Sequence, residues 1–157
     1  MSKVTRATQM LDRAKVAFTV HTYDYDAGAD KIGMQAAEAL GESPARVLKT
    51  LMALVDGKPV CVILPSDREV AMKKLAAAVG GKAAEMMKPD AAERISGFKV
   101  GGISPFGQMK KLRTVIEQDA LKEDLVYMNG GQRGLQVRLN PNDAVKVLDA
   151  ITAPIAA

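Results

Sequence analysis

Hydrophobic residues recur with a helical period in some parts of this chain and alternate with polar residues in others, and the change of period predicts its elements. Helical spacing and capping residues predict helices over 5–15, 34–40, 68–79 and 89–96 and from 140 onward. Alternation and short apolar runs predict strands over 18–25, 47–55, 58–65, 83–87, 114–121, 125–129 and 135–140. The strands come mostly as hairpins with helices between them, so we expect a mixed α+β arrangement rather than a doubly wound nucleotide-binding fold.

Turn residues join two of these strands and begin a helix. Asp56-Gly57 separates two apolar runs and is a strong signal for a tight hairpin, so the strands on either side of it should be antiparallel neighbours. Ser66 and Asp67 follow the second strand and can cap the helix expected over 68–79. The chain, 1–157, is long enough for one domain with a proper core and too short for two, so a single domain is predicted.

The stretch 47–55, VLKTLMALV, is apolar on both faces if it forms a strand. Alternation places Lys49 beside Leu51 and Ala53 on one face and Thr50 on the other. A strand with two apolar faces is normally covered on both sides, so Lys49 should point into a covered region. A salt bridge, escape of the lysine stem to the sheet edge, and a ligand site remain equal explanations on spacing alone.

The composition is that of a soluble globular protein, with 48% hydrophobic and 25% charged residues. The apolar runs are too short to cross a bilayer and the first residues lack a signal-peptide segment, so we expect a cytoplasmic protein with no membrane contact. The net charge of +4 mildly favours polyanionic partners, but the basic clusters are as typical of solvated helix faces as of a phosphate-binding groove. No base-reading recognition helix is evident, so no DNA partner is expected.

The single cysteine, Cys61, and the single histidine, His21, restrict the possible chemistry. They provide too few soft ligands for a structural zinc site, and we expect neither a metal nor a cofactor. Cys61 lies in the apolar run PVCVILP and is interpreted as a core residue. His21 is interpreted as structural, and a nucleophile activated by imidazole would have to use this one residue.

Two glycine-rich segments stand out, GGISPFG at 101–107 and GGQRG at 130–134. Glycine pairs let backbone N–H groups approach a ligand, and such amides can bind a phosphate or stabilise an oxyanion. A simple turn also explains any one glycine pair. Two such loops, together with a lysine on a core-facing strand, favour a functional site.

Three segments, VLKTLMALVDGK, GFKVGGISPFGQMKKLRTVI and YMNGGQRGLQVRL, resemble in order and separation the signature segments of the YbaK/EbsC family of aminoacyl-tRNA deacylases. The opening ATQMLDRAKVAFTVHTYDYD and the closing DAVKVLDA resemble it too, so nearly the whole chain is covered. The pattern is most similar to the bacterial YbaK type, a free-standing enzyme that removes cysteine mischarged onto proline tRNA. Relatives of this fold include the editing insertion of prolyl-tRNA synthetase and ProX-type deacylases, which remove alanine. The resemblance implies a compact α+β domain whose mixed sheet closes toward a barrel, with a cleft for the aminoacylated 3′ end of tRNA.

The resemblance also implies the residues of the site. Lys49 corresponds to the hallmark functional residue of the family and is assigned as catalytic. The implied substrate-binding residues are Tyr23, Ile32, Thr50, Gly101, Gly102, Ser104, Asn129, Gly131 and Arg133. Asn129 stands where bacterial YbaK proteins usually have serine, and Ile32 where many have phenylalanine. Both departures touch the side-chain pocket, so they bear on the amino acid accepted more than on the reaction.

For a cysteine substrate, the mechanism that the resemblance implies needs no protein nucleophile, because the substrate thiol attacks its own ester carbonyl and leaves as a thiolactone. We hypothesise that Lys49 binds the terminal adenosine's phosphate or polar groups of the substrate, and that amides around Gly101 and Gly102 polarise the carbonyl. The alternatives are hydrolysis of an alanyl or other small aminoacyl ester and a non-catalytic module that binds acceptor stems or a synthetase. The expected partners are the aminoacyl-tRNA and prolyl-tRNA synthetase, which would supply tRNA identity.

Overall fold

The computed structural model of the chain describes residues 3–28 and 32–157. Its helices are α1 (Arg6–Arg13), α2 (Ile32–Leu40), α3 (Met72–Ala78), α4 (Pro89–Ser96) and α5 (Pro141–Leu148), with 3-10 turns η1 (Pro44–Arg46) and η2 (Gln118–Lys122). Its strands are β1 (Phe18–Thr22), β2 (Leu48–Val55), β3 (Lys58–Pro65), β4 (Ala84–Met86), β5 (Arg113–Glu117), β6 (Val126–Asn129), β7 (Leu135–Leu139) and β8 (Ile151–Ala153). No helix in the described part of the chain is long and apolar enough to span a membrane.

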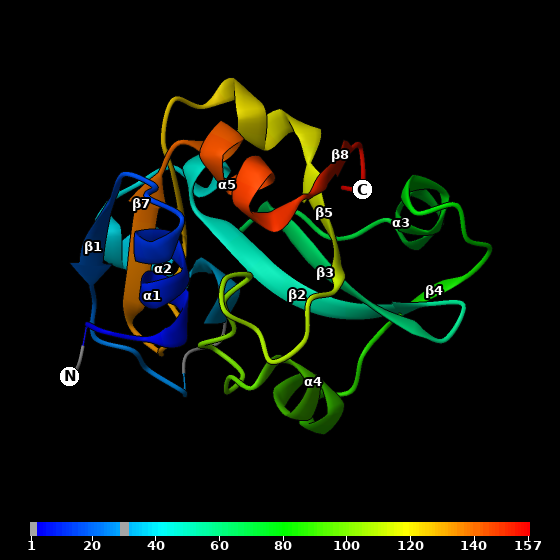
Figure 1. Ribbon diagram of the computed structural model, residues 1–157, viewed down its shortest axis with the longest axis horizontal. Coiled ribbons are helices and arrows are strands. Elements are labelled where there is room, and N and C mark those ends of the chain that lie inside the picture. Colours follow the sequence, from blue (N-terminus) through cyan, green and yellow to red (C-terminus); the bar gives the residue numbers. More distant parts are fainter. Residues whose placement is uncertain (1–2, 29–31) are drawn as a thin grey trace.

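The strands form two sheets that meet at the start of β2 (Figure 1). β1, β7 and β6 make an antiparallel sheet in that order. The second sheet has the order β4-β2-β3-β5-β8, antiparallel from β4 to β3 and parallel from β3 to β8. A parallel bridge between Val47 and Tyr127 links the two sheets. The predicted α+β arrangement with a mixed sheet is therefore confirmed.

The β2–β3 hairpin runs through the middle of the molecule toward α3 and β4 (Figure 1). Asp56 and Gly57 have φ values of 51° and 79°, and two positive φ values in succession are what the tightest hairpin turn requires. Asparagine, aspartate and glycine tolerate this conformation best, which is why the pair could be read from the sequence. The predicted antiparallel hairpin is confirmed.

Both faces of β2 are covered, as the sequence predicts. Leu48 and Met52 belong to a core cluster built with α1, α5 and the three-stranded sheet. Ala53 and Val55 belong to a second cluster with β3, β5 and α3. A smaller cluster packs α2 against the junction of the two sheets. The strand that carries Lys49 is therefore fixed from both sides.

The helix predicted over 68–79 begins only at Met72, without a side-chain cap, so the predicted cap at Ser66-Asp67 is wrong. The Ser66 hydroxyl donates to the Val47 carbonyl instead. Val70 pairs with Ala156 near the C-terminus of the chain. Helical periodicity predicts that these residues form the first turn of α3, but in the structure they pair with distant parts of the chain.

The first helix begins next to one of the glycine segments. Thr5 caps α1 and forms a reciprocal capping box with Thr8. The Thr5 hydroxyl also donates to the Gly130 carbonyl at 2.5 Å. This bond fixes the start of α1 to the connection between β6 and β7.

Candidate functional site

The cavity beside Lys49 lies at the edge of β2 and has a volume of about 300 Å³. Residues of α2, β2, β4, α4, β6, β7 and the Gly101 turn surround it. The lining residues are Ala36, Val47, Leu48, Lys49, Thr50, Leu51, Met52, Met86, Met87, Pro89, Ala92, Val100, Gly101, Ile103, Asn129 and Gln136. Four of the predicted site residues, Lys49, Thr50, Gly101 and Asn129, are therefore brought together here.

The side chain of Lys49 is 17% exposed, so it points into a largely covered region, as predicted. Its Nζ lies 3.6 Å from Oε1 of Glu69, whose own side chain is 85% exposed. An ion pair with so exposed a partner contributes on the order of 0–1 kcal/mol. The structure thus gives Lys49 a salt-bridge partner, but a weak one that a substrate anion can replace.

One edge of β2 is unpaired where it borders the cavity. Within residues 3–28 and 32–157, no strand pairs with this edge between the bridge at Val47 and the ladder with β4, which begins at Ala53. The Met52 carbonyl points to this edge, since it accepts from the Met87 amide at 3.0 Å. Alternate residues of an antiparallel strand direct their backbone groups to the same edge, so the N–H and C=O of Thr50 point there as well. Neither has a partner among the described residues, and β2 offers the cavity one donor and one acceptor.

Two buried side-chain oxygens in the cavity wall also lack a hydrogen-bond partner within the described residues: Oγ1 of Thr50 and Oε1 of Gln136. An unpaired buried polar atom costs on the order of 1–3 kcal/mol, and a bound ligand is one common explanation. The predicted site residues do not include Gln136. Its position between buried Leu135 and Val137 of β7 is the signal that could have found it.

A tight turn over 99–102 brings backbone to the cavity. Gly101 has a φ of 89°, and the Gly102 amide donates to the Lys99 carbonyl at 2.8 Å. The Gly102 amide is therefore occupied within the turn in this structure. The Val100 amide donates to Oε2 of Glu93 at 2.8 Å. The Gly101 amide has no partner among the described residues and is a free donor of this turn.

Asn129 holds the two glycine segments together. Its Nδ2 donates to the Gly101 carbonyl at 3.2 Å, and its Oδ1 accepts from the Gly131 amide at 2.7 Å. The residue is 8% exposed and lines the cavity. Because both ends of the amide are already bonded, Asn129 shapes the cavity by fixing its backbone wall.

Tyr25 supports the Gly101 turn, although nothing in the sequence pattern singled it out. A β-carbon on Gly101 would lie 2.4 Å from the Tyr25 hydroxyl oxygen, so the tyrosine packs directly on the glycine. The Arg133 guanidinium lies over the same ring at 5.2 Å, and its Nε donates to the Val100 carbonyl at 2.9 Å. Tyr25 and Arg133 therefore hold the turn, and only glycine satisfies both the backbone angle and the contact at position 101.

Several predicted site residues lie outside this cavity. Gly102, Gly131 and Arg133 line a second cavity beside it. Ser104 is fully buried, and its Oγ accepts from the Phe106 amide at 3.1 Å, so it stabilises the loop. The side chain of Ile32, at the start of α2, lies outside the described part of the structure.

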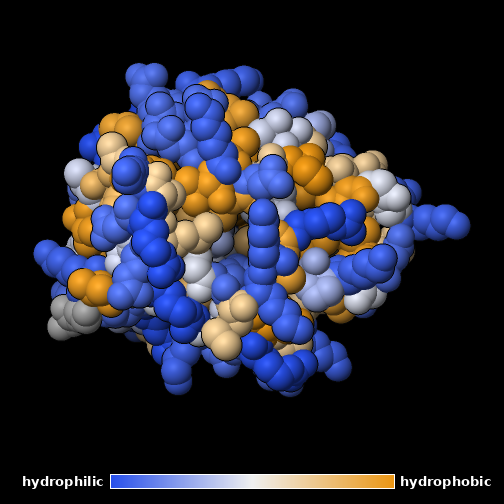
Figure 2. Space-filling view, in the orientation of Figure 1, coloured by the Kyte–Doolittle hydropathy of each residue, from blue (hydrophilic) through white to orange (hydrophobic). Residues whose placement is uncertain are grey.

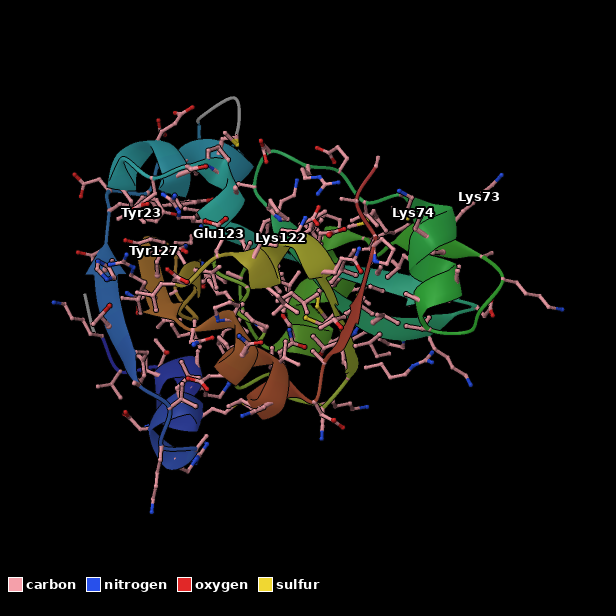
Figure 3. All side chains as sticks on the ribbon, turned by 90° about the horizontal axis from the view of Figure 1, so that it is seen from above. Tyr23, Lys73, Lys74, Lys122, Glu123 and Tyr127 are labelled. Atoms are coloured by element: carbon pink, nitrogen blue, oxygen red, sulfur yellow. The ribbon has the colours of Figure 1, made fainter. Side chains whose placement is uncertain are left out.

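Tyr23 packs against α2 beside Tyr127 (Figure 3). Burial raises the pKa of Tyr23 and the nearby Tyr25 adds to the rise, whereas hydrogen bonds with the Gly134 backbone and the Gln136 side chain oppose it. Tyr23 therefore keeps its proton at neutral pH.

Cys61 is a buried core residue, as the sequence indicates. Burial raises the pKa of the Cys61 thiol to about 12, with smaller opposing contributions from Gln108 and Thr114, so no thiolate is available at neutral pH. A hydrogen bond of 2.8 Å joins Nε2 of His21 to the Thr19 hydroxyl. No group of three or more histidine, cysteine, aspartate or glutamate side chains in the described part of the chain could hold a metal ion.

Hydrophobic surface on the face drawn in Figure 2 is divided into separate areas by projecting hydrophilic side chains. Two of the exposed large hydrophobic residues, Met86 and Val100, line the Lys49 cavity. The rim of this cavity is therefore partly apolar, which is typical of sites for small organic groups.

One family model and several known proteins are similar in sequence to this chain. The family model of the aminoacyl-tRNA editing domain matches residues 27–147. The chain is 30% identical over 153 residues to EbsC of Enterococcus faecalis, whose proposed activity is that of a Cys-tRNA(Pro)/Cys-tRNA(Cys) deacylase, and the match covers 96% of this chain and 92% of that protein. It is also 30% identical over 100 residues to a proline–tRNA ligase of Maridesulfovibrio salexigens, where 64% of this chain aligns with 17% of the ligase.

Solved structures share the fold. The crystal structure of a proposed trans-editing enzyme for prolyl-tRNA synthetase has a TM-score of 0.83 and 18% identity, and the match covers 100% of this chain and 98% of that one. A hypothetical protein of known structure gives a TM-score of 0.86 at 19% identity, over 98% of this chain and 100% of its own. At these identities the likeness shows the fold alone.

Proposed function

The chain belongs to the family of aminoacyl-tRNA editing domains, and we propose that it is a free-standing deacylase, one domain over 1–157, that removes cysteine mischarged onto proline tRNA. The observation that carries the proposal is the content of the Lys49 cavity. It holds free donors and acceptors, but no histidine, cysteine, aspartate or glutamate is among its described lining residues. A site of this kind can orient an ester, but its described lining has no imidazole or carboxylate to activate a hydroxyl or a water, which favours an attacking group supplied by the substrate.

In the proposed reaction the sulfur of the cysteinyl group attacks its own carbonyl carbon. A carbon–sulfur bond forms, the carbon–oxygen bond to the terminal ribose breaks, and the thiol proton ends on the ribose oxygen. The products are a cyclic thiolactone and free tRNA. Because the attack is intramolecular, correct positioning supplies much of the acceleration, and the protein needs to add only stabilisation of the oxyanion.

Backbone and side-chain groups of three residues are proposed to position the substrate. Lys49 exchanges its exposed Glu69 partner for the terminal adenosine's phosphate or a polar group of the substrate. The free amide of Gly101 donates to the developing oxyanion. The unpaired N–H, C=O and hydroxyl of Thr50 hold the polar edge of the aminoacyl group. The contact between the Lys49 ammonium and a phosphate would be a charge-assisted hydrogen bond, which is stronger than a bond between neutral groups.

The apolar part of the cavity wall favours a second candidate substrate. Leu48, Met52, Ala92 and Ile103 line the cavity and would accept a methyl group as readily as a thiol. In that case water, helped by a ribose hydroxyl of the tRNA, hydrolyses an alanyl ester. The two candidates differ in whether the substrate thiol is required.

Replacement of Gly101 by alanine is expected to lower kcat/KM for deacylation about tenfold, which corresponds to about 1.4 kcal/mol of lost transition-state stabilisation. The added β-carbon would lie 2.4 Å from the Tyr25 hydroxyl oxygen at a φ of 89°, so the turn and its free amide must shift. Gly80→Ala is the matched control, because Gly80 has a φ of 72° and nothing within 4 Å of the added carbon. The control should lose stability without losing rate, and an equal loss of rate in both variants would contradict the role of the turn.

The proposed function is tested by loss of labelled cysteine from cysteinyl-tRNA(Pro) and cysteinyl-tRNA(Cys). We expect the isolated protein to deacylate both at the same rate, because a chain of 157 residues has little surface for reading the rest of a tRNA. Prolyl-tRNA synthetase in the cytoplasm is proposed to supply the identity of the tRNA. No release of label from either tRNA would refute the function, and strong discrimination by the isolated protein would refute the role of the synthetase.

A further inference from the structure

A second cavity, with a volume of about 420 Å³, lies next to the Lys49 cavity. The turn over 99–102 separates the two, since Gly101 lines the first and Gly102 lines the second. A β-carbon on Gly102 would lie 2.8 Å from the Arg133 amide nitrogen, so this turn packs directly on the connection between β6 and β7. The two cavities therefore share a wall made of the two glycine segments.

Three cations line the second cavity: Arg6, Lys99 and Arg133. No aspartate or glutamate is among its described lining residues, and none of the three cations forms an ion pair within the described part of the chain. Elsewhere in the molecule Lys49 and Arg68 do have carboxylate partners. The three cations of this cavity are therefore free of direct ion pairs with the described carboxylates.

The two arginines are held in place by contacts that leave their charge available. Arg6 donates to the carbonyls of Gly97 and Gly107 and lies over the Phe98 ring at 4.5 Å. Arg133 uses only its Nε in a hydrogen bond, so its two terminal nitrogens are free of partners among the described residues. A guanidinium fixed in this way is suited to a planar or tetrahedral oxyanion. Lys99 is exposed and free of any such contact.

We propose that the second cavity binds a backbone phosphodiester of the tRNA acceptor strand, next to the terminal nucleotide whose aminoacyl group enters the Lys49 cavity. The inference rests on the proposed function. The adjacency of the two cavities favours this occupant, because one strand of RNA carries a phosphate at each nucleotide and can reach both. Affinity for RNA arises largely from such phosphate contacts, which makes it dependent on salt.

The test measures binding of an uncharged RNA hairpin ending in CCA, so that it does not depend on catalysis. One RNA has native linkages, and each of the others has one uncharged methylphosphonate among the last three linkages. Lys99→Gln and Lys99→Glu are compared with Lys73→Gln, a control on the exposed side of α3, at the far end of the molecule from Tyr23 (Figure 3). Lys99 is exposed, so neither substitution should disturb folding.

We expect Lys99→Gln to weaken binding about three- to fivefold and to reduce the slope of log affinity against log salt by about 0.7. Lys99→Glu should weaken binding further, and Lys73→Gln should have no effect. One of the uncharged linkages should weaken RNA binding by the wild-type protein. The same linkage should weaken RNA binding by the Lys99→Gln variant much less, because the Lys99 charge and its phosphate act as a pair.

The inference is overturned if the loss of binding from the Lys99 substitution and the loss from each uncharged linkage simply add. It is also overturned if Lys99→Glu binds the RNA as tightly as the wild-type protein, and an anionic protein segment would then be the better candidate ligand of this cavity. The result of this binding test can be distinguished from the result of the deacylation test. A wild-type protein that deacylates cysteinyl-tRNA without this coupling refutes only the phosphate site. Coupling in a protein that releases no amino acid refutes only the deacylase.

Discussion

Replacing Lys49 by alanine is expected to lower kcat/KM for deacylation of cysteinyl-tRNA at least about 100-fold, because removal of one partner of a covered charged contact costs on the order of 2–5 kcal/mol. The side chain is 17% exposed and belongs to the cavity wall, so a substrate anion bound there would be largely removed from water. The effect should appear in single-turnover rates as well as in KM. Thermal unfolding of the variant should remain close to that of the wild-type protein, since Lys49 contributes only a weak ion pair to the fold.

Glu69→Ala separates this role from the salt bridge. If the pair with Glu69 were what matters, removing either partner would have the same effect. We expect Glu69→Ala to keep nearly full activity, because its carboxylate is 85% exposed and is the partner that we propose the substrate displaces. Wild-type activity in Lys49→Ala, or an equal loss in Glu69→Ala, would contradict the assignment of Lys49.

The parts of the fold that could be predicted are those fixed by local chemistry. The hairpin at Asp56-Gly57 follows from the positive φ of both residues, and the end of α4 follows from Gly97, whose φ is 81°. The covered position of Lys49 follows from the apolar residues on both faces of β2. In each case the decisive neighbours lie within a few residues along the chain.

The parts that could not be predicted depend on residues far apart in the sequence. The first turn expected for α3 is lost to the pairing of Val70 with Ala156. Glu117 is 2% exposed and accepts from the amides of Asp119, Ile155 and Ala156, which anchors the end of the chain beside β5. Periodicity cannot indicate such bonds, because the sequence around a buried glutamate in a strand does not identify its hydrogen-bond partners.

In the candidate site, too, some features could be predicted from the sequence and others depend on distant residues. The family resemblance singled out Lys49, Thr50, Gly101 and Asn129, and the fold brings these four to one cavity. It did not indicate that the Gly102 amide is used inside its own turn, that Tyr25 packs on Gly101, or that Gln136 lines the cavity. Those facts depend on the register of β7 and on the path of the chain after β1.

The substrate thiol is the second feature with a large expected effect. Exchange of cysteine for serine on the same tRNA replaces sulfur by oxygen and changes the size of the side chain little. A hydroxyl is a far weaker nucleophile at neutral pH than a thiol, whose thiolate fraction is a few per cent. The cavity lining offers no histidine or carboxylate to activate it. We therefore expect cleavage of the seryl ester to be slower by a factor on the order of 100 or more, since the advantage of intramolecular attack is lost.

The most direct test of this account is the single-turnover rate of deacylation for cysteinyl-, seryl- and alanyl-tRNA(Pro) under identical conditions, with Lys49→Ala as the reference for residual cleavage. Attack by the substrate thiol predicts fast release of cysteine, with the seryl and alanyl esters close to the rate of that reference. Comparable wild-type rates for all three esters, well above the reference, would contradict it and would show that water is the nucleophile.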